Sequence, residues 1–262
     1  MSSQTDDGHG SIRGASPAPD DGARDLDLRA LIVILMAGTL ALVAINLVLK
    51  ALSTPERPAP YVGLFDVNLE TNIPTMWNAA LLLGVGTACL LVAGLEQRRR
   101  RTGWIVAAVL SLALATDEVL KLHERLRTVG AWLLENTPAS LPTYSWVLPG
   151  LVVALGGIAL VWWWTARKPH HTSWLLRIAV LLYGLGAVVV EAFSGWIEGA
   201  YGVGAAYAAV TALEEGLEMS ACIVAVVAAL RMLRVLDLQS GPRAFFIPEA
   251  DPGAAAPVAA GA

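Results

Sequence analysis

Acidic side chains lie inside or at the ends of three apolar segments of this sequence. The first segment begins near Gly103 and ends in Thr116-Asp117-Glu118-Val119-Leu120-Lys121-Leu122-His123-Glu124. The other two carry Glu191 with Glu198, and Glu214 and Glu215 with Glu218. A carboxylate within a membrane-length apolar run is costly, so these residues mark a candidate site for binding or chemistry.

Carboxylates in an apolar environment must be neutralised, and three kinds of chemistry can do this. Basic side chains could pair with them. A bound cation could do so, since carboxylate oxygens suit Ca²⁺ or Mn²⁺ and several carboxylates with a histidine suit Fe or Zn. Some could instead stay protonated and exchange protons with the outside, as in proton-coupled carriers.

Helical spacing predicts which of these acids share a face. At about 100° per residue, residues four or seven positions apart point in similar directions. The pairs at such spacings are Asp117 with Glu124, Glu191 with Glu198, and Glu214 with Glu218. Lys121 falls on the face of Asp117, so a salt-bridge ladder at the membrane surface also fits these boundary residues.

We therefore expect one site that binds a metal or another cation. Its candidate ligands are Glu118, His123, Glu191, Glu214 and Glu218. Supporting positions are Asp117, Glu124, Glu198, Glu215, Asp66 and Glu70. The metal could be Fe, Zn, Mn or Ca, and a small molecule or an ion is the expected ligand.

Several known site types do not fit. The chain has no Glu-x-x-His pair, which four-helix dimetal carboxylate proteins use. Its four histidines are His9, His123, His170 and His171, too few near the acids for a three-histidine zinc site. We find no phosphate-binding glycine loop and no patch for nucleic acid. Cys89 and Cys222 both lie in apolar segments, where cysteine behaves as a small hydrophobic residue.

Composition sets the class of protein. Hydrophobic residues make up 56% of the chain, charged residues only 15%, and the mean hydropathy is +0.59. A soluble domain carries about 25% charged residues. The sequence therefore predicts an all-α polytopic membrane protein whose first partner is the lipid bilayer.

Apolar runs of about 20 residues can cross the hydrocarbon core, and six such runs predict a six-helix transmembrane bundle. The expected spans are 30–49, 74–95, 103–123, 147–166, 174–199 and 204–230. Residues 124–136 have helical periodicity and form either a helix at the interface or an extension of the third span. The polar tails, 1–27 and 237–262, are expected to be disordered.

Basic residues predict the orientation. With both termini cytoplasmic, the outer side keeps few of the 18 Lys and Arg residues, namely Lys50, Arg57, Lys121, Arg125 and Arg127. Excess Lys and Arg belongs on the cytoplasmic side. In this orientation the acids of the three segments converge on the outer half of the membrane.

The combination of motifs resembles an uncharacterised family of bacterial six-span membrane proteins. The matching motifs are Phe65-Asp66-x-Asn68-x-Glu70, Asn72-Ile73-Pro74-Thr75, Asp117-Glu118 with His123-Glu124, and Glu214-Glu215 with Glu218-Met219. The resemblance covers about residues 61 to 220. It implies a multi-pass protein of the inner membrane and assigns no activity.

Three functions follow as hypotheses. In the first, the bound metal activates water or a redox reaction, so the protein is a hydrolase or oxidoreductase acting on a lipid-soluble or periplasmic substrate. In the second, the same acids serve a proton- or cation-coupled transporter or channel. In the third, they anchor a partner and the protein is a structural membrane subunit.

Overall fold

The chain folds into a bundle of long helices, seen here in a computed structural model. The structure describes residues 24–54, 56–69, 71–122, 125–135, 142–166, 168, 170–237 and 243–246. The helices are α1 (Arg29–Leu52), α2 (Val62–Phe65), α3 (Ile73–Leu95), α4 (Arg101–Leu120), α5 (Leu126–Glu135), α6 (Val147–Thr165), α7 (His170–Gly184), α8 (Glu191–Tyr201) and α9 (Ala205–Leu230). A π-helical segment, η2 (Leu185–Val190), joins α7 to α8. The fold was predicted to be all-α; it is mainly helical, and three short strands accompany the helices.

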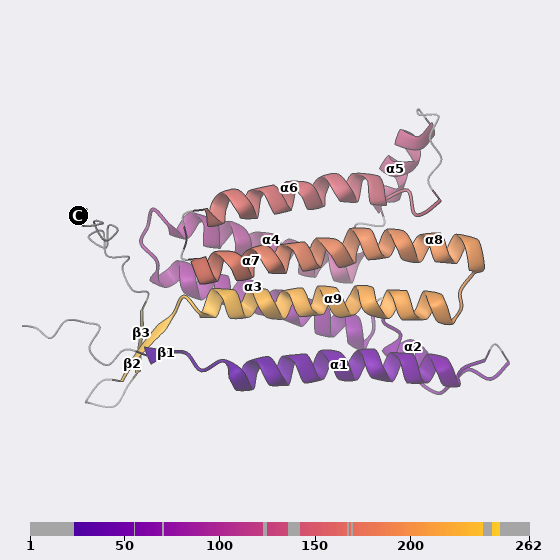
Figure 1. The fold of residues 1–262 in the computed structure, drawn as a ribbon, viewed down its shortest axis with the longest axis horizontal. Coiled ribbons are helices and arrows are strands. Elements are labelled where there is room, and N and C mark those ends of the chain that lie inside the picture. Colours follow the sequence, from indigo (N-terminus) through magenta and orange to yellow (C-terminus); the bar gives the residue numbers. More distant parts are fainter. Residues whose placement is uncertain are drawn as a thin grey trace, which may run out of the picture.

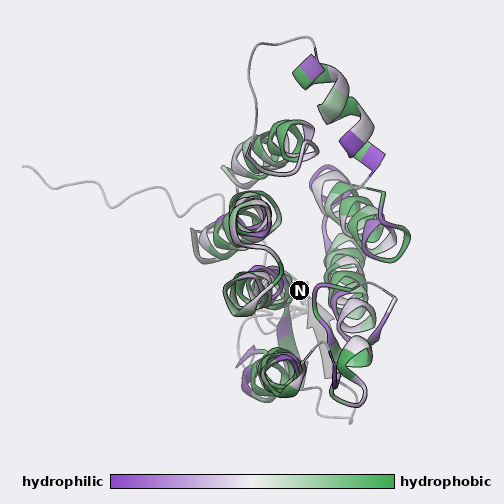
Figure 2. Cartoon of the chain, turned by 90° about the vertical axis from the view of Figure 1, so that its right-hand side faces the viewer, coloured by the Kyte–Doolittle hydropathy of each residue, from purple (hydrophilic) through white to green (hydrophobic). Residues whose placement is uncertain are grey.

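The long helices form two packed rows (Figures 1 and 2). One row holds α6, the continuous α7–η2–α8 rod, α9 and α1 in that order, and neighbours in it are in contact. The other row holds α4 and α3, which pack on each other, and α3 also packs on α9. Helix α9 thus contacts both rows, which places its side chains in the interior.

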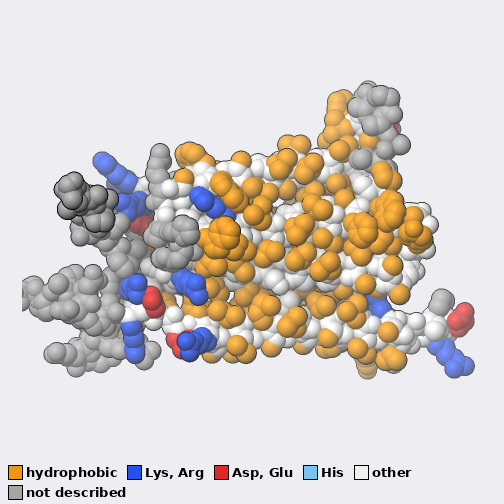
Figure 3. Space-filling model, viewed as in Figure 1, with side chains coloured by type: hydrophobic (Ala, Val, Ile, Leu, Met, Phe, Trp, Pro, Cys, Tyr) orange, Lys and Arg blue, Asp and Glu red, His pale blue; other side chains and the backbone are white. Residues whose placement is uncertain are grey.

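The outer surface of the bundle is apolar. Among the described residues, five helices are long and apolar enough to cross a membrane: α1, α3, α4, α6 and the rod from Thr172 to Tyr201. Hydrophobic side chains cover the middle of the molecule, and Lys and Arg gather at the end that carries the strands (Figure 3). Val152 on α6, for example, is 71% exposed. Such a surface is compatible with a location in a membrane.

The start of α3 follows from its sequence. The Asn72 side chain accepts a hydrogen bond from the Thr75 amide at 3.2 Å, and Pro74 occupies the first turn. Both are favourable at a helix N-terminus, because Asn satisfies a free amide and proline has none to satisfy.

The end of α4 shows whether the helical residues after it extend this span or form a helix of their own. The helix ends at Leu120, and Lys121 adopts a left-handed backbone conformation with φ of 53°. Helix α5 is therefore a separate element and does not extend α4. The predicted third span, 103–123, is longer than the helix for the same reason.

Three short strands lie within or beside the stretches predicted to be disordered. They are β1 (Arg24–Asp25), β2 (Arg234–Asp237) and β3 (Arg243–Phe246), and they pair antiparallel in that order. An ion pair between Arg234 and Asp25 joins β1 to β2. This pairing brings the two ends of the bundle segment together at one end of the molecule, which we call the sheet end (Figure 1).

Candidate functional site

Glu218 lies at the centre of the acidic cluster. Its side chain projects from α9 into the bundle and is 8% exposed. Glu118 from α4, Glu191 from α8 and Glu214 one turn away on α9 are close enough to interact with it electrostatically. The Tyr183 hydroxyl of α7 hydrogen-bonds to its carboxyl group. Four carboxyl groups from three helices thus meet in the interior, and we call them the carboxylate cluster.

Neutral donors surround the cluster. The Ser194 hydroxyl is 3.4 Å from Glu214 Oε2 and donates to the Glu191 carbonyl oxygen at 2.9 Å. Its side chain is only 1% exposed. The indole nitrogen of Trp146 donates to Glu191 Oε1 at 3.1 Å. These groups can stabilise a carboxyl group in either protonation state, because a hydroxyl both donates and accepts.

The π-helical segment of the α7–α8 rod lies close to α9 at Gly186. A Cβ atom on Gly186 would lie 3.0 Å from both the Glu214 carbonyl oxygen and Glu218 Cγ. A larger residue here would require these neighbours to move by a few tenths of an ångström. Single π-helical turns occur frequently at functional sites, and this one ends where Glu191 begins α8.

Replacing Gly186 by alanine is expected to separate the rod from α9. We expect the mutation to lower the free energy of unfolding by about 1–3 kcal/mol, as overpacking of a close contact does. Thermal unfolding in detergent measures this. The matched control is Gly184→Ala, whose added methyl group would meet Ile158 and Ala154 at ordinary distances of 3.7 and 3.9 Å. Equal stability of the two variants would contradict the close packing.

Glu198 belongs to a second polar group at the end of the bundle opposite the strands, which we call the distal end. Its Oε2 accepts a hydrogen bond from the Tyr144 hydroxyl at 2.5 Å, and that hydroxyl is 3.4 Å from the Tyr207 hydroxyl. Tyr207 in turn donates to Asn68 Oδ1 at 3.0 Å. Burial and the hydrogen bond to Glu198 raise the pKa of Tyr144. Tyr144 therefore stays a neutral donor.

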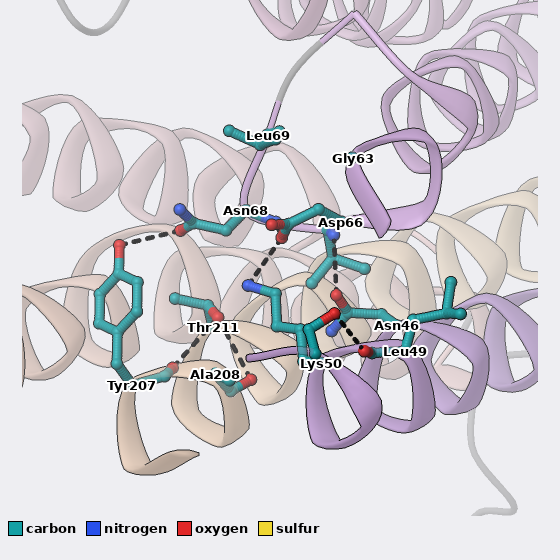
Figure 4. A network of polar contacts seen from close by, with 12 residues as sticks. Asn46, Leu49, Lys50, Gly63, Asp66, Asn68, Leu69, Tyr207, Ala208 and Thr211 are labelled. Carbon is teal, nitrogen blue, oxygen red and sulfur yellow. Dashed lines mark hydrogen bonds and ion pairs between the residues drawn. The ribbon is translucent and has the colours of Figure 1, made fainter. Parts of the chain in front are cut away.

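Asp66 lies apart from the carboxylate cluster. Its carboxylate pairs with Lys50 Nζ at 2.8 Å, and the two side chains are only 16% and 19% exposed. The adjoining Val67 amide donates to Asn46 Oδ1 at 3.3 Å (Figure 4). These contacts fasten the segment between α2 and α3 to the last turns of α1.

The remaining predicted positions divide into two groups. Glu215 follows Glu214 and interacts with it electrostatically, and Asp117 neighbours Glu118 on α4. Glu118, not Asp117, is the α4 residue that interacts with Glu218. Glu70, His123 and Glu124 lie outside the described residues.

Sequence reasoning missed Tyr183, Tyr144, Tyr207 and Asn78. Asn78 on α3 is fully buried, its Oδ1 is 3.9 Å from the Cys222 thiol, and its Nδ2 has no hydrogen-bond partner among the described residues. The available signal was a strongly polar residue within the first two turns of a predicted span. The tyrosines gave none, since aromatic residues near helix ends are common in membrane proteins.

The kind of ligand atom in the carboxylate cluster limits which ions it can bind. Among the described residues, no group of three or more His, Cys, Asp and Glu side chains is arranged to bind a metal ion, and His123 lies outside that part of the chain. The groups that do meet are carboxyl and hydroxyl groups. Such oxygens suit protons and hard cations better than the softer metals that need nitrogen or sulfur.

Comparison with known families covers the whole bundle. The family model described as a domain of unknown function, DUF8692, matches residues 30–233, so the chain belongs to this family. The match confirms the resemblance to an uncharacterised family and extends from α1 through α9. No curated protein and no solved structure matches the chain.

Proposed function

We propose that this DUF8692 protein is a six-span protein of the bacterial inner membrane whose carboxylate cluster reversibly binds protons or a small cation. The observation that carries the proposal is the burial of Glu218 among Glu118, Glu191 and Glu214. Four acids held together inside an apolar bundle cannot all remain charged without a counter-charge. A site of this kind takes up and releases positive charge, as carriers and channels require.

Helix α9 supplies the sixth span in this proposal. Its 26 residues reach about 39 Å at 1.5 Å per residue, enough to cross the hydrocarbon core. It lies between α1 and the α7–η2–α8 rod in the same row. Its three glutamates distinguish it from the other spans, and Leu213 faces outward while Glu218 is buried. Glu218 is thus shielded from lipid.

The basic residues support cytoplasmic termini. Lys and Arg side chains gather at the sheet end, where the described chain begins and ends (Figure 3). The excess of basic residues marks the cytoplasmic side. The distal end, with Glu198 and the Lys50–Asp66 pair, would then face the periplasm, and α5 would lie at that surface.

Infrared spectroscopy of the purified protein tests the proposal. We expect a carboxyl band that changes with pH and that Glu214→Gln reduces, because Glu214 belongs to the cluster. Glu56→Gln is the matched control, since Glu56 is exposed in the segment between α1 and α2. If Na⁺, K⁺ or Ca²⁺ shifts the same band, the ligand is a cation; if none does, it is the proton.

Elemental analysis of the same preparation distinguishes the alternative function. Stoichiometric Fe, Zn or Mn that is lost in Glu214→Gln would support the metal-dependent enzyme in place of the carrier. A preparation without metal whose carboxyl band is insensitive to pH and to cations would overturn the proposal.

A further inference from the structure

Four polar residues of α9 form one continuous stripe. They are Tyr207, Thr211, Glu214 and Glu218, spaced by four, three and four residues, whereas Glu215 and Ser220 fall outside it. At about 100° per residue these positions share a face. The stripe starts at the distal end of the bundle and ends about halfway along α9, so it joins the Glu198 group to the carboxylate cluster.

Among the described residues, the distal end of the stripe adjoins a shallow surface pocket. Glu198 and Tyr144 line this pocket, of about 600 Å³, together with Thr143, Gly195 and Trp196. From this cavity a chain of oxygen atoms leads inward: Glu198 Oε2 to the Tyr144 hydroxyl at 2.5 Å, and Tyr144 to the Tyr207 hydroxyl at 3.4 Å. Figure 4 shows Tyr207 with its hydroxyl directed at Asn68. Tyr207 also interacts electrostatically with Glu214, two turns further along α9.

The other end of the stripe is sealed. Below Glu218, a buried apolar cluster fills the interior with Leu81, Leu82, Ala115, Met219, Cys222 and Ile223. A second cluster follows toward the sheet end, with Val92, Trp104 and Ala228 among its fully buried members. Two mainly apolar layers, interrupted by the buried Asn78 beside Cys222 and by Ser111 beside Leu82, thus lie between the carboxylate cluster and the sheet end. Toward the distal end, polar side chains of the stripe continue to Tyr207.

We propose that the ligand of the cluster is the proton, and that it enters from the distal end through the Tyr144 and Tyr207 hydroxyls. This inference rests on the proposed function and adds the ligand, the route and its direction. Each phenol oxygen accepts one proton and releases its own, so both tyrosines end neutral and no electrons move. The two turns from Tyr207 to Glu214 pass Thr211 and Ser194 and need bridging water. An oxygen relay of this kind conducts protons but offers no cage for a metal ion.

The charged and titratable groups near this route come from several elements of the bundle. Glu198 and Glu191 face it from α8, Glu118 from α4, Tyr183 from α7, and Glu214, Glu215, Glu218 and Cys222 from α9 itself. Tyr144 faces it from the segment before α6, and Asn68 from the segment before α3. Lys50 is paired with Asp66 behind Asn68.

The test follows the rate at which the carboxyl band responds to a sudden change of pH. Tyr207→Phe removes the inner hydroxyl and is expected to slow the response by about 100-fold, the lower range for a positioned proton-transfer group. Tyr144→Phe is expected to slow it similarly. Tyr201→Phe is the matched control, because this tyrosine of α8 is exposed at the same end. The final amplitude should be equal in all four proteins.

Amplitude and rate separate the two proposals. A wild-type band without any pH response removes the proposed function itself. A normal amplitude with unchanged rates in Tyr207→Phe and Tyr144→Phe overturns the proposed route and leaves the proposed function standing. If Tyr207→Phe fails to fold, the rate of Tyr144→Phe decides the test. In vesicles of mixed orientation, the fast fraction should equal the fraction with the distal end outward, which protease cleavage of the tails measures. A fast fraction equal to the opposite orientation would also overturn the route.

Discussion

Glu218→Gln is expected to reduce the pH response of the cluster while leaving the protein as stable as wild type, or more stable. Glutamine has almost the same shape and can still accept a hydrogen bond from Tyr183. It removes a buried ionisable group that faces Glu118, Glu191 and Glu214. Relief of this burial cost is worth about 1–3 kcal/mol. Thermal unfolding in detergent and the infrared titration measure the two effects on one preparation.

Met219→Leu is the control for general damage to this part of α9. Met219 is the next residue, is fully buried, and its replacement by leucine conserves volume, so little change is expected in either measurement. A Glu218→Gln protein that unfolds well below wild type would show that the carboxylate holds the helices together. Residues of a functional site often make a protein less stable because they serve its activity. A more stable Glu218→Gln protein would be an example of this trade-off.

The helices could be predicted from the sequence because their signals are local. An apolar run long enough to cross the hydrocarbon core indicates a membrane span by itself, and Pro74 shortly after Asn72 indicates the start of a helix. The strands and the π-helical segment could not be predicted in this way. Arg24–Asp25 pairs with a strand more than 200 residues away, and the contact of Gly186 with α9 exists only once the helices have packed.

The acids of the site were visible in the sequence because ionisable groups are rare in apolar segments. Which acid faces the interior was harder to predict. Counting seven residues on one helix grouped Asp117 with Glu124, but Lys121 takes a left-handed conformation and α4 ends before Glu124. The tyrosines were missed because their role depends on which hydroxyl meets which carboxylate after the helices pack.

Lys50→Met is expected to be the most destabilising of these substitutions. The Lys50–Asp66 pair is mostly buried, so loss of the lysine leaves an uncompensated carboxylate at the end of α1. Breaking one partner of a buried pair costs about 3–5 kcal/mol. The segment that carries Asn68 should loosen with it, since Asp66 Oδ1 also accepts from the Asn68 amide at 3.0 Å. Thermal unfolding and hydrogen exchange of residues 62–69 measure both effects.

The double variant Lys50→Met/Asp66→Asn separates charge pairing from packing. With both charges gone, most of the lost stability should return, because an apolar or neutral pair of similar size often replaces a buried ion pair without cost. Arg57→Gln is the matched control, an exposed basic residue in the same connection between α1 and α2. Equal losses in the single and double variants would mean that the lysine stem, and not the ion pair, fastens this segment to α1. A loss below about 1 kcal/mol for Lys50→Met would place the pair among surface ion pairs.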